Sequence, residues 1–185
     1  MSVLIDTASA VVIRAIDAFT ELMGKVLAWA CLAMVLIMGA VVLMRYAFQQ
    51  NSIAVQEVVT YFHGAVFMLG AAFTLKANEH VRVDIFFQRF SPKTQAWVNV
   101  LGTVLLLLPV CFFILIISWD YVALSWRVQE SSREAGGLGG VYFLKSLILL
   151  MPISLILQGI AEILRNIRRI AGNESAHLPT GAPHA

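Results

Sequence analysis

Residues 26–44 read VLAWACLAMVLIMGAVVLM and contain no charged side chain. About 20 apolar residues are enough to cross a bilayer as a helix, because each residue advances a helix by about 1.5 Å and the hydrocarbon core is about 30 Å thick. Three more apolar runs follow at residues 58–75, 94–119 and 146–161, and the last extends back to Val141 across a single Lys145. The sequence therefore predicts an all-α integral membrane protein with four transmembrane helices.

These runs organise the chain as one membrane domain with little sequence outside the bilayer. Of the 185 residues, 59% are hydrophobic and 13% are charged, and the mean hydropathy is +0.82, far above that of a soluble domain. The net charge of +2 is too small to indicate binding of nucleic acid. The predicted elements are an amphipathic arm helix (3–25), four transmembrane helices (26–46, 56–76, 94–119, 141–164), a short interfacial cytoplasmic helix (82–90), a periplasmic loop (120–140) and a disordered tail (171–185).

The distribution of lysine and arginine predicts the orientation of the spans. One side of the predicted membrane carries nine of these residues and the other carries four. Cytoplasmic segments are the ones enriched in positive charge, so we expect both termini in the cytoplasm and the first and third connections outside. The nine are Arg14, Lys25, Lys76, Arg82, Arg89, Lys93, Arg165, Arg168 and Arg169, and the four are Arg45, Arg127, Arg133 and Lys145.

The arm has helical periodicity without the uniform hydrophobicity of a span. At 100° per residue, most of its apolar side chains share one face, while its charged side chains share the opposite face, with Ile13 as the exception. Such a helix can lie in the headgroup plane with its apolar face towards the lipid, or it can pack on a partner protein. The apolar set is Ile5, Ala8, Val12, Ala15, Ile16, Phe19, Leu22 and Met23, and the charged set is Asp6, Arg14, Asp17, Glu21 and Lys25.

Ionisable groups deep in a membrane usually indicate a transport pathway, and this sequence has few of them. His63 is the one ionisable side chain well inside a predicted span. A neutral imidazole that bonds to a neighbouring helix is favoured over a proton relay. Glu57 lies at the outer end of the second span, where snorkelling or pairing with Arg45 would satisfy it. The chain therefore resembles a scaffold more than a pump.

Small residues and cysteines inside the spans favour close helix packing over binding of a cofactor. Gly39, Gly64 and Gly70 allow helix backbones to approach one another. Cys31 and Cys111 lie in apolar runs, where a thiol behaves as a small hydrophobe. We expect no catalytic residue, no metal and no cofactor.

Two connections between the predicted spans contain distinctive residues whose role has more than one explanation. The second, residues 76–93, is either a cytoplasmic turn with positive-inside charges or a docking surface. Its three phenylalanines support the docking surface, because a bare turn does not need them. The third ends in the run GGLGG at residues 136–140. It lacks the preceding strand and the following Lys-Ser/Thr of a phosphate-binding loop, so we expect a flexible loop facing outward.

A family resemblance rests on residues around the second span. Glu57 precedes the span, GAAFTLK at residues 70–76 closes it, and HVRVD at residues 80–84 follows. Together with the four spans and the arm, this resembles the small membrane subunit (DctQ type) of tripartite ATP-independent periplasmic (TRAP) transporters, from about Leu22 to Ile170. Lys76 stands where that pattern favours arginine, and a single Glu57 replaces a frequent pair of acidic residues.

The resemblance implies a division of labour among three proteins of a bacterial inner membrane system. A periplasmic substrate-binding protein (DctP type) would capture an organic acid, and a large membrane subunit (DctM type) would move it with sodium. This chain would brace the large subunit within the membrane lipids, without binding substrate itself. The candidate partner-interface residues are Glu57, His63, Gly64, Gly70, Lys76, His80, Arg82 and Asp84.

Two other functions remain open. A membrane anchor of a respiratory or other multisubunit enzyme would hold haem between two histidines at similar depth. His80, however, lies 17 residues beyond His63, about 25 Å along a helix. A self-sufficient oligomeric exporter should carry a carboxylate within its first span, and residues 26–44 contain none.

Overall fold

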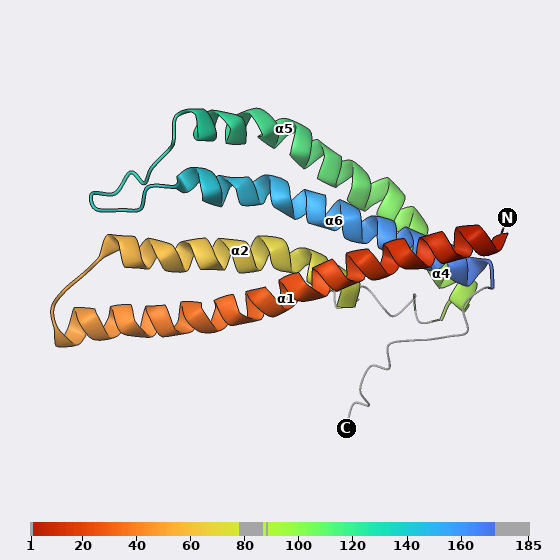
Figure 1. Ribbon diagram of the computed structural model, residues 1–185, viewed down its shortest axis with the longest axis horizontal. Coiled ribbons are helices and arrows are strands. Elements are labelled where there is room, and N and C mark those ends of the chain that lie inside the picture. The colour runs from red at the N-terminus through yellow and green to blue at the C-terminus, as the bar shows by residue number, and fades with distance from the viewer. Residues whose placement is uncertain (1, 78–86, 88, 173–185) are drawn as a thin grey trace, which may run out of the picture.

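The computed structural model describes residues 2–77, 87 and 89–172 of the chain (Figure 1). The predicted interfacial helix at residues 82–90 lies mostly outside these ranges, and the predicted disordered tail lies outside them from residue 173 onward. His80, Arg82 and Asp84 are likewise outside the described residues.

The described residues are helical apart from short connections. The elements are α1 (Ser2–Ala47), α2 (Ile53–Ala77), α4 (Pro92–Gly102), the π-helix η1 (Thr103–Leu107), α5 (Leu108–Arg127) and α6 (Val141–Ile170). Four helical stretches in this part of the chain are long and apolar enough to cross a membrane: Ser9–Ala47, Ile53–Ala77, Pro92–Arg127 and Val141–Ile170. The prediction of an all-helical chain with four long apolar helices is confirmed, and the orientation of its termini stays a prediction.

The four long helices are arranged as a row instead of a closed bundle. Helix α2 packs against α1 on one side and against α6 on the other, and α6 packs against α5 and α4. Figure 1 shows the order α5, α6, α2, α1 at the end that carries the connections 48–52 and 128–140, which we call the loop end. At the opposite end, which we call the terminal end, α1 crosses α6 (Figure 1).

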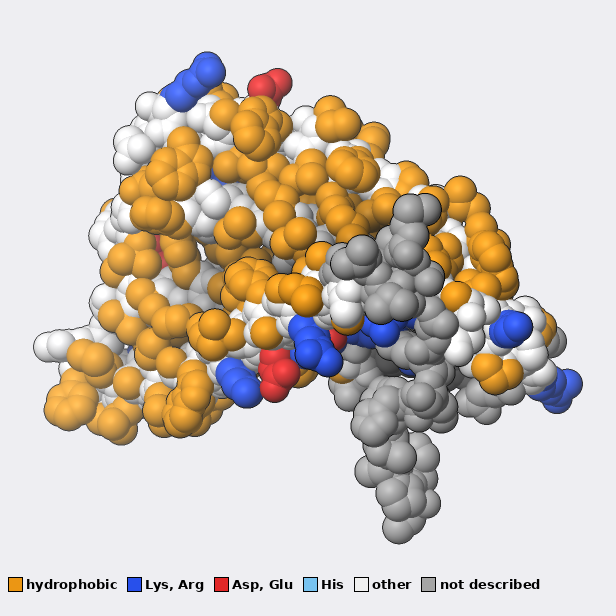
Figure 2. Space-filling model, turned by 45° about the vertical axis from the view of Figure 1, so that its right-hand side comes forward, with side chains coloured by type: hydrophobic (Ala, Val, Ile, Leu, Met, Phe, Trp, Pro, Cys, Tyr) orange, Lys and Arg blue, Asp and Glu red, His pale blue; other side chains and the backbone are white. Residues whose placement is uncertain are grey.

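This thin arrangement leaves many large apolar side chains exposed, and a few polar side chains are buried between the helices together with apolar ones. The largest fully buried side chains are Gln158, Asn166, Pro152 and Ser125, whereas Ile116 is 74% exposed. Hydrophobic side chains cover much of the face shown in Figure 2, and charged side chains gather at a few places on it. An apolar exterior suits a protein surrounded by lipid, because lipid cannot hydrogen-bond with polar groups, and such groups are better satisfied between helices.

The arm and the first span form one helix, since no break separates them between Ser2 and Ala47. Ile13, Thr20, Leu27 and Val41 are its buried residues, spaced at multiples of seven along one face, as helices in antiparallel contact require. Ile13, the exception in the sequence pattern, therefore belongs to the packed face. The apolar face of the arm points away from the protein, because Leu22 is 63% exposed. Its predicted position in the headgroup plane stays a prediction.

The third span is built from three helical segments joined end to end. Ser91 caps α4 by accepting a hydrogen bond from the Thr94 N–H at 3.3 Å, and Pro92 occupies the first turn, where proline is tolerated. The π-helix lies directly before Pro109, whose ring has no N–H to continue the α-helical bonding. Helix α5 continues to Arg127, beyond the predicted limit at residue 119, so the loop that follows is shorter than predicted.

Glycines allow close approach at three helix contacts. A Cβ on Gly64 would lie 2.9 Å from Leu144 Cδ1, so the predicted role of Gly64 in close packing is supported by the contact of α2 with α6. Gly24 of α1 faces the Phe73 ring of α2, and Gly159 of α6 faces Leu107 of η1. No heavy atom lies near the Cβ positions of Gly39 and Gly70, so these two do not mediate close contacts among the described residues.

Candidate functional site

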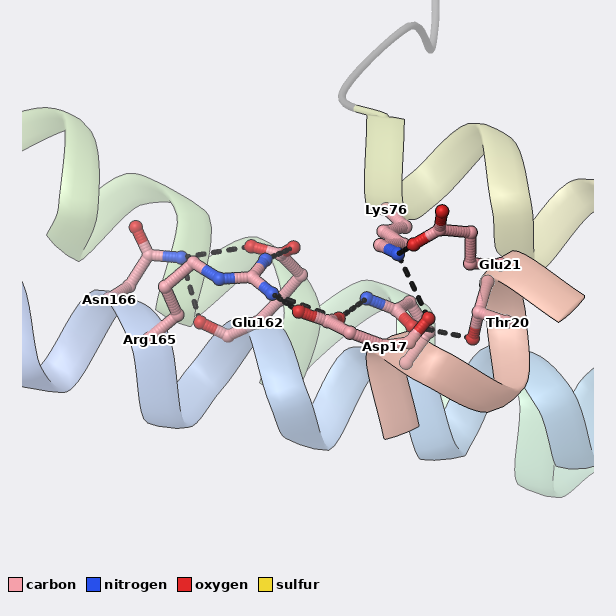
Figure 3. A network of polar contacts seen from close by, with 8 residues as sticks. Asp17, Thr20, Glu21, Lys76, Glu162, Arg165 and Asn166 are labelled. Carbon is pink, nitrogen blue, oxygen red and sulfur yellow. Dashed lines mark hydrogen bonds and ion pairs between the residues drawn. The ribbon is translucent and has the colours of Figure 1, made fainter. Parts of the chain in front are cut away.

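A partly buried ion pair joins the arm to the last helix at the terminal end. The Arg165 guanidinium of α6 donates to both carboxylate oxygens of Asp17 on α1, at 2.7 and 3.0 Å, and it also pairs with Glu162 one turn earlier on α6. These three side chains are between 19% and 24% exposed. Figure 3 shows them pointing towards one another between the two helices. The two carboxylates are held near each other because the arginine lies between them.

Uncharged side chains extend this contact along the same helix faces. The Thr20 hydroxyl donates to Gln158 Oε1 at 2.9 Å, and the Gln158 amide donates to Asp17 at 3.2 Å. Thr20 is 4% exposed and Gln158 is fully buried. A buried amide without partners would be strongly unfavourable, so these bonds bind α1 to α6 in one register.

Lys76 ties the end of α2 to the same part of α1. Its ammonium donates to the Asp17 carbonyl oxygen at 2.9 Å and pairs with Glu21 at 3.3 Å. On the other flank, the Asn99 amide of α4 donates to Asn166 of α6 at 3.4 Å. We call this set the polar network, and its members are Asp17, Thr20, Glu21, Lys76, Asn99, Gln158, Glu162, Arg165 and Asn166. It joins α1, α2, α4 and α6 into one unit.

At the loop end, Glu57 binds the third connection to α2. Its carboxylate accepts hydrogen bonds from the Ser132 hydroxyl and, at 2.6 Å, from the Leu138 N–H. Of the two alternatives expected for Glu57, snorkelling or pairing with Arg45, the pairing is not formed, because the loop folds back over the start of α2 and supplies the donors. The loop is itself closed by an isolated antiparallel bridge between Ser131 and Gly139. Glu57 is therefore engaged within the chain.

Replacing Glu57 by alanine is expected to release this loop from α2. Without its acceptor, the Leu138 amide should exchange with deuterium roughly tenfold faster, as measured by hydrogen–deuterium exchange of peptides from residues 131–138. Glu57→Gln keeps one acceptor oxygen and should have a smaller effect. Unchanged exchange in the alanine variant would show that the carboxylate does not hold the loop.

A second anchor of the loop joins Glu130 to the second turn of α6. Glu130 accepts from the Lys145 ammonium at 2.5 Å and from the Ser125 hydroxyl at 2.7 Å. Lys145 also lies over the Tyr121 ring, 4.0 Å from its centroid. The hydrogen bond from Lys145, followed by that from Ser125, lowers the pKa of Glu130 below its ordinary value of 4.5.

This shift gives the loop a defined response to acid. A carboxyl group with a lowered pKa stabilises the folded state above its unfolded pKa, and that stabilisation is lost as the pH falls through the folded value. We expect constant Trp126 fluorescence from about pH 8 to 5 and a change below about pH 4.5, in a chain whose other tryptophans are replaced by phenylalanine. Trp126 reports on this region because it donates to Ser146 at 2.8 Å. The same titration with Glu130→Gln should show a smaller change, and an identical acid transition in that variant would refute the assignment.

Some of the predicted interface residues make contacts within the chain, and others do not. Glu57, Gly64 and Lys76 are used in contacts within the chain, and Gly70 contributes only a carbonyl oxygen to Thr74 at 3.1 Å. His63 is exposed, and its ring stacks on Phe67 with centroids 6.4 Å apart. The expected hydrogen bond from His63 to a neighbouring helix is not formed with any residue in ranges 2–77, 87 and 89–172.

Most members of the polar network are not evident from the sequence alone. Asp17, Thr20, Gln158, Arg165 and Asn166 were not among the predicted site residues. One signal was present, since Gln158, Glu162, Arg165 and Asn166 are spaced by four, seven and eight residues and thus share one face of a helix. A polar stripe on a membrane helix indicates a protein contact, because lipid cannot satisfy it.

Residues 34–169 match the family model described as tripartite ATP-independent periplasmic transporters, DctQ component. The match runs from the second half of α1 almost to the end of α6, and the Asp17 side of the polar network precedes it. No curated protein and no solved structure matches the chain significantly.

Proposed function

Because this chain belongs to the DctQ family of TRAP transporter components, we propose that it is the small membrane subunit that braces a separate large transport subunit. The family is one of transporter components and not of enzymes. Association with other TRAP components follows from membership, and the bracing role is the proposal.

The polar network is the observation that supports this role. It engages its charged groups with one another and ties four helices together, while the surface outside it is largely apolar. A subunit that carries a solute needs polar groups free to bind it at membrane depth. A subunit that braces another needs a fixed interior and an apolar exterior, and this chain has both.

The proposal extends to the partners and the setting. The large subunit would be of the DctM type and would couple uptake of an organic acid to sodium, and a DctP-type binding protein would approach from the loop end. The chain would lie in a bacterial inner membrane with both termini in the cytoplasm, as the positive-inside rule favours. Membrane lipids would cover the faces that no partner covers.

Reconstitution tests the proposed division of labour. The chain alone, the large membrane subunit alone, and both together would be placed in liposomes with the binding protein and a sodium gradient. We expect sodium-dependent accumulation with the complete set and none with this chain alone. Accumulation of any solute by this chain alone would contradict the proposal.

Removal of the arm should weaken assembly through loss of the polar network. Deleting residues 1–23 removes Asp17, Thr20 and Glu21, which leaves Arg165 and Gln158 without their partners on α1. We expect reduced co-purification of the large subunit and reduced uptake. Deleting residues 2–9 is the matched control, because it shortens the arm while the polar network stays intact. If both deletions reduce co-purification and uptake equally, the effect of the arm does not depend on the polar network.

A further inference from the structure

A groove of about 820 Å³ lies between α1 and α2 near the loop end. Met34, Met38 and Val41 line it from α1, and Gln56, Thr60 and His63 line it from α2. Arg45 and Tyr46 also border it, in the last turn of α1. The groove is therefore apolar along one wall, carries polar groups along the other, and has a cation at the end nearest the connection 48–52.

His63 is the unusual member of this lining. It lies about ten residues into α2 from Ile53, which places it about 15 Å along the helix, well inside the hydrocarbon. Its side chain is exposed to the groove and has no hydrogen-bond partner among the residues that the structure describes. A polar ring at this depth is unfavourable without a partner, so the groove calls for an occupant that can hydrogen-bond there.

Arg45 adds a second requirement at the shallow end of the same groove. Two carboxylates of the loop end are already engaged, since Glu57 binds the loop and Glu130 pairs with Lys145. Within the described ranges, no carboxylate lies within ion-pair distance of Arg45. Charge complementarity therefore favours an occupant with a negative group near the membrane surface.

These two requirements together discriminate between possible occupants. A phospholipid offers a phosphate at the surface, but its acyl chains have no hydrogen-bonding group at the depth of His63. A transmembrane helix offers both, because its side chains can be polar at any depth. The other large groove, about 720 Å³ between α5, η1 and α6, makes no such demand, since its residues Asn99, Glu162 and Asn166 bond with one another.

We propose that the groove between α1 and α2 receives a transmembrane helix of the large membrane subunit, with a hydrogen-bonding side chain opposite His63 and a carboxylate near Arg45. This inference rests on the proposed function, because it assumes that such a subunit binds the chain. It assigns the interface to one edge of the row, formed by α1 and α2, and leaves α5 at the other edge to lipid.

Site-specific photocrosslinking in native membranes tests the location. A photoreactive amino acid at Met38, which is 45% exposed in the groove, is compared with one at Ile116, which is 74% exposed on α5. We expect a crosslink to the large subunit from position 38 and none from position 116. A crosslink from position 116 alone, or only lipid adducts at position 38, would overturn the inference.

Substitutions test the two polar groups. His63→Leu and Arg45→Ala should each weaken binding of the large subunit by about 3- to 20-fold, as loss of one polar contact between membrane helices does. His63→Gln should restore most of the affinity because it can still hydrogen-bond. Arg127→Ala is the control for Arg45, since it also removes an arginine from the last turn of a span at the loop end.

The co-purification results distinguish failure of the groove assignment from failure of the proposed function. If the wild-type chain does not co-purify with the large subunit at all, the proposed function fails. If the wild-type chain co-purifies and the His63→Leu and Arg45→Ala variants bind as tightly as it does, the proposed function stands and the assignment of the groove fails.

Discussion

Replacing Arg165 by alanine is expected to lower the free energy of unfolding by about 1–3 kcal/mol, because it leaves partly buried charged groups without their hydrogen-bonding partner. The substitution leaves the carboxylates of Asp17 and Glu162 facing each other without the guanidinium that lies between them. Part of the lost stability comes from repulsion between the two carboxylates. The rest is the cost of leaving partly buried carboxylates without the hydrogen bonds of the guanidinium.

Thermal unfolding in detergent would measure this effect. Lys25→Ala is the control, because it also removes an ion pair, to Glu21 at 3.3 Å, but Lys25 is 72% exposed and such pairs contribute little. Combining Asp17→Asn with Arg165→Ala should recover part of the lost stability, since it removes one of the two carboxylate charges that have lost the arginine. If Arg165→Ala and Lys25→Ala have the same melting temperature, the ion pair of Arg165 with Asp17 does not stabilise the fold.

Replacing Gly159 by valine is expected to destabilise the protein by about 1–3 kcal/mol through overpacking. A Cβ at this position would lie 3.0 Å from Leu107 Cδ2 and 3.2 Å from Thr103 Cγ2. Both side chains belong to the π-helix η1, so the added methyl groups should force α6 away from the third span.

Gly39→Val is the matched control for this prediction. Its Cβ position has no heavy atom within 4 Å, so the same chemical change should leave the melting temperature nearly unaltered. Adding Leu107→Ala to Gly159→Val should restore part of the stability by making room. Equal melting temperatures for the two valine variants would show that the contact of α6 with η1 is not tight.

The long apolar helices were predictable from hydropathy, whereas their limits were not. The predicted boundary near residue 25 rested on a change in composition, from an arm with charges to a span without them. A change in polarity does not end a helix, and neither proline nor a favourable cap occurs there, so α1 continues. Similarly, Tyr121 to Trp126 continue α5 because aromatic and aliphatic side chains at the membrane surface are compatible with helix.

The polar contacts could not be assigned from one helix at a time. The sequence placed Asp17 and Glu21 on a common face, and that face was expected to meet water or headgroups. Its partners on α6 lie more than 130 residues away, at Gln158 and Arg165, and local periodicity holds no information about that distance. For Glu57, the choice of Arg45 followed proximity along the chain, while the donors came from a loop 75 and 81 residues further on.

The one-layer row of α5, α6, α2 and α1 has a consequence for the life of the protein before assembly. A single row of helices has two broad faces, so a newly made copy exposes apolar surface on both faces and cannot bury either one within itself. Such a copy is prone to stick to other unassembled chains. Its abundance in the cell should therefore follow the supply of its companion, and it should accumulate poorly when made by itself.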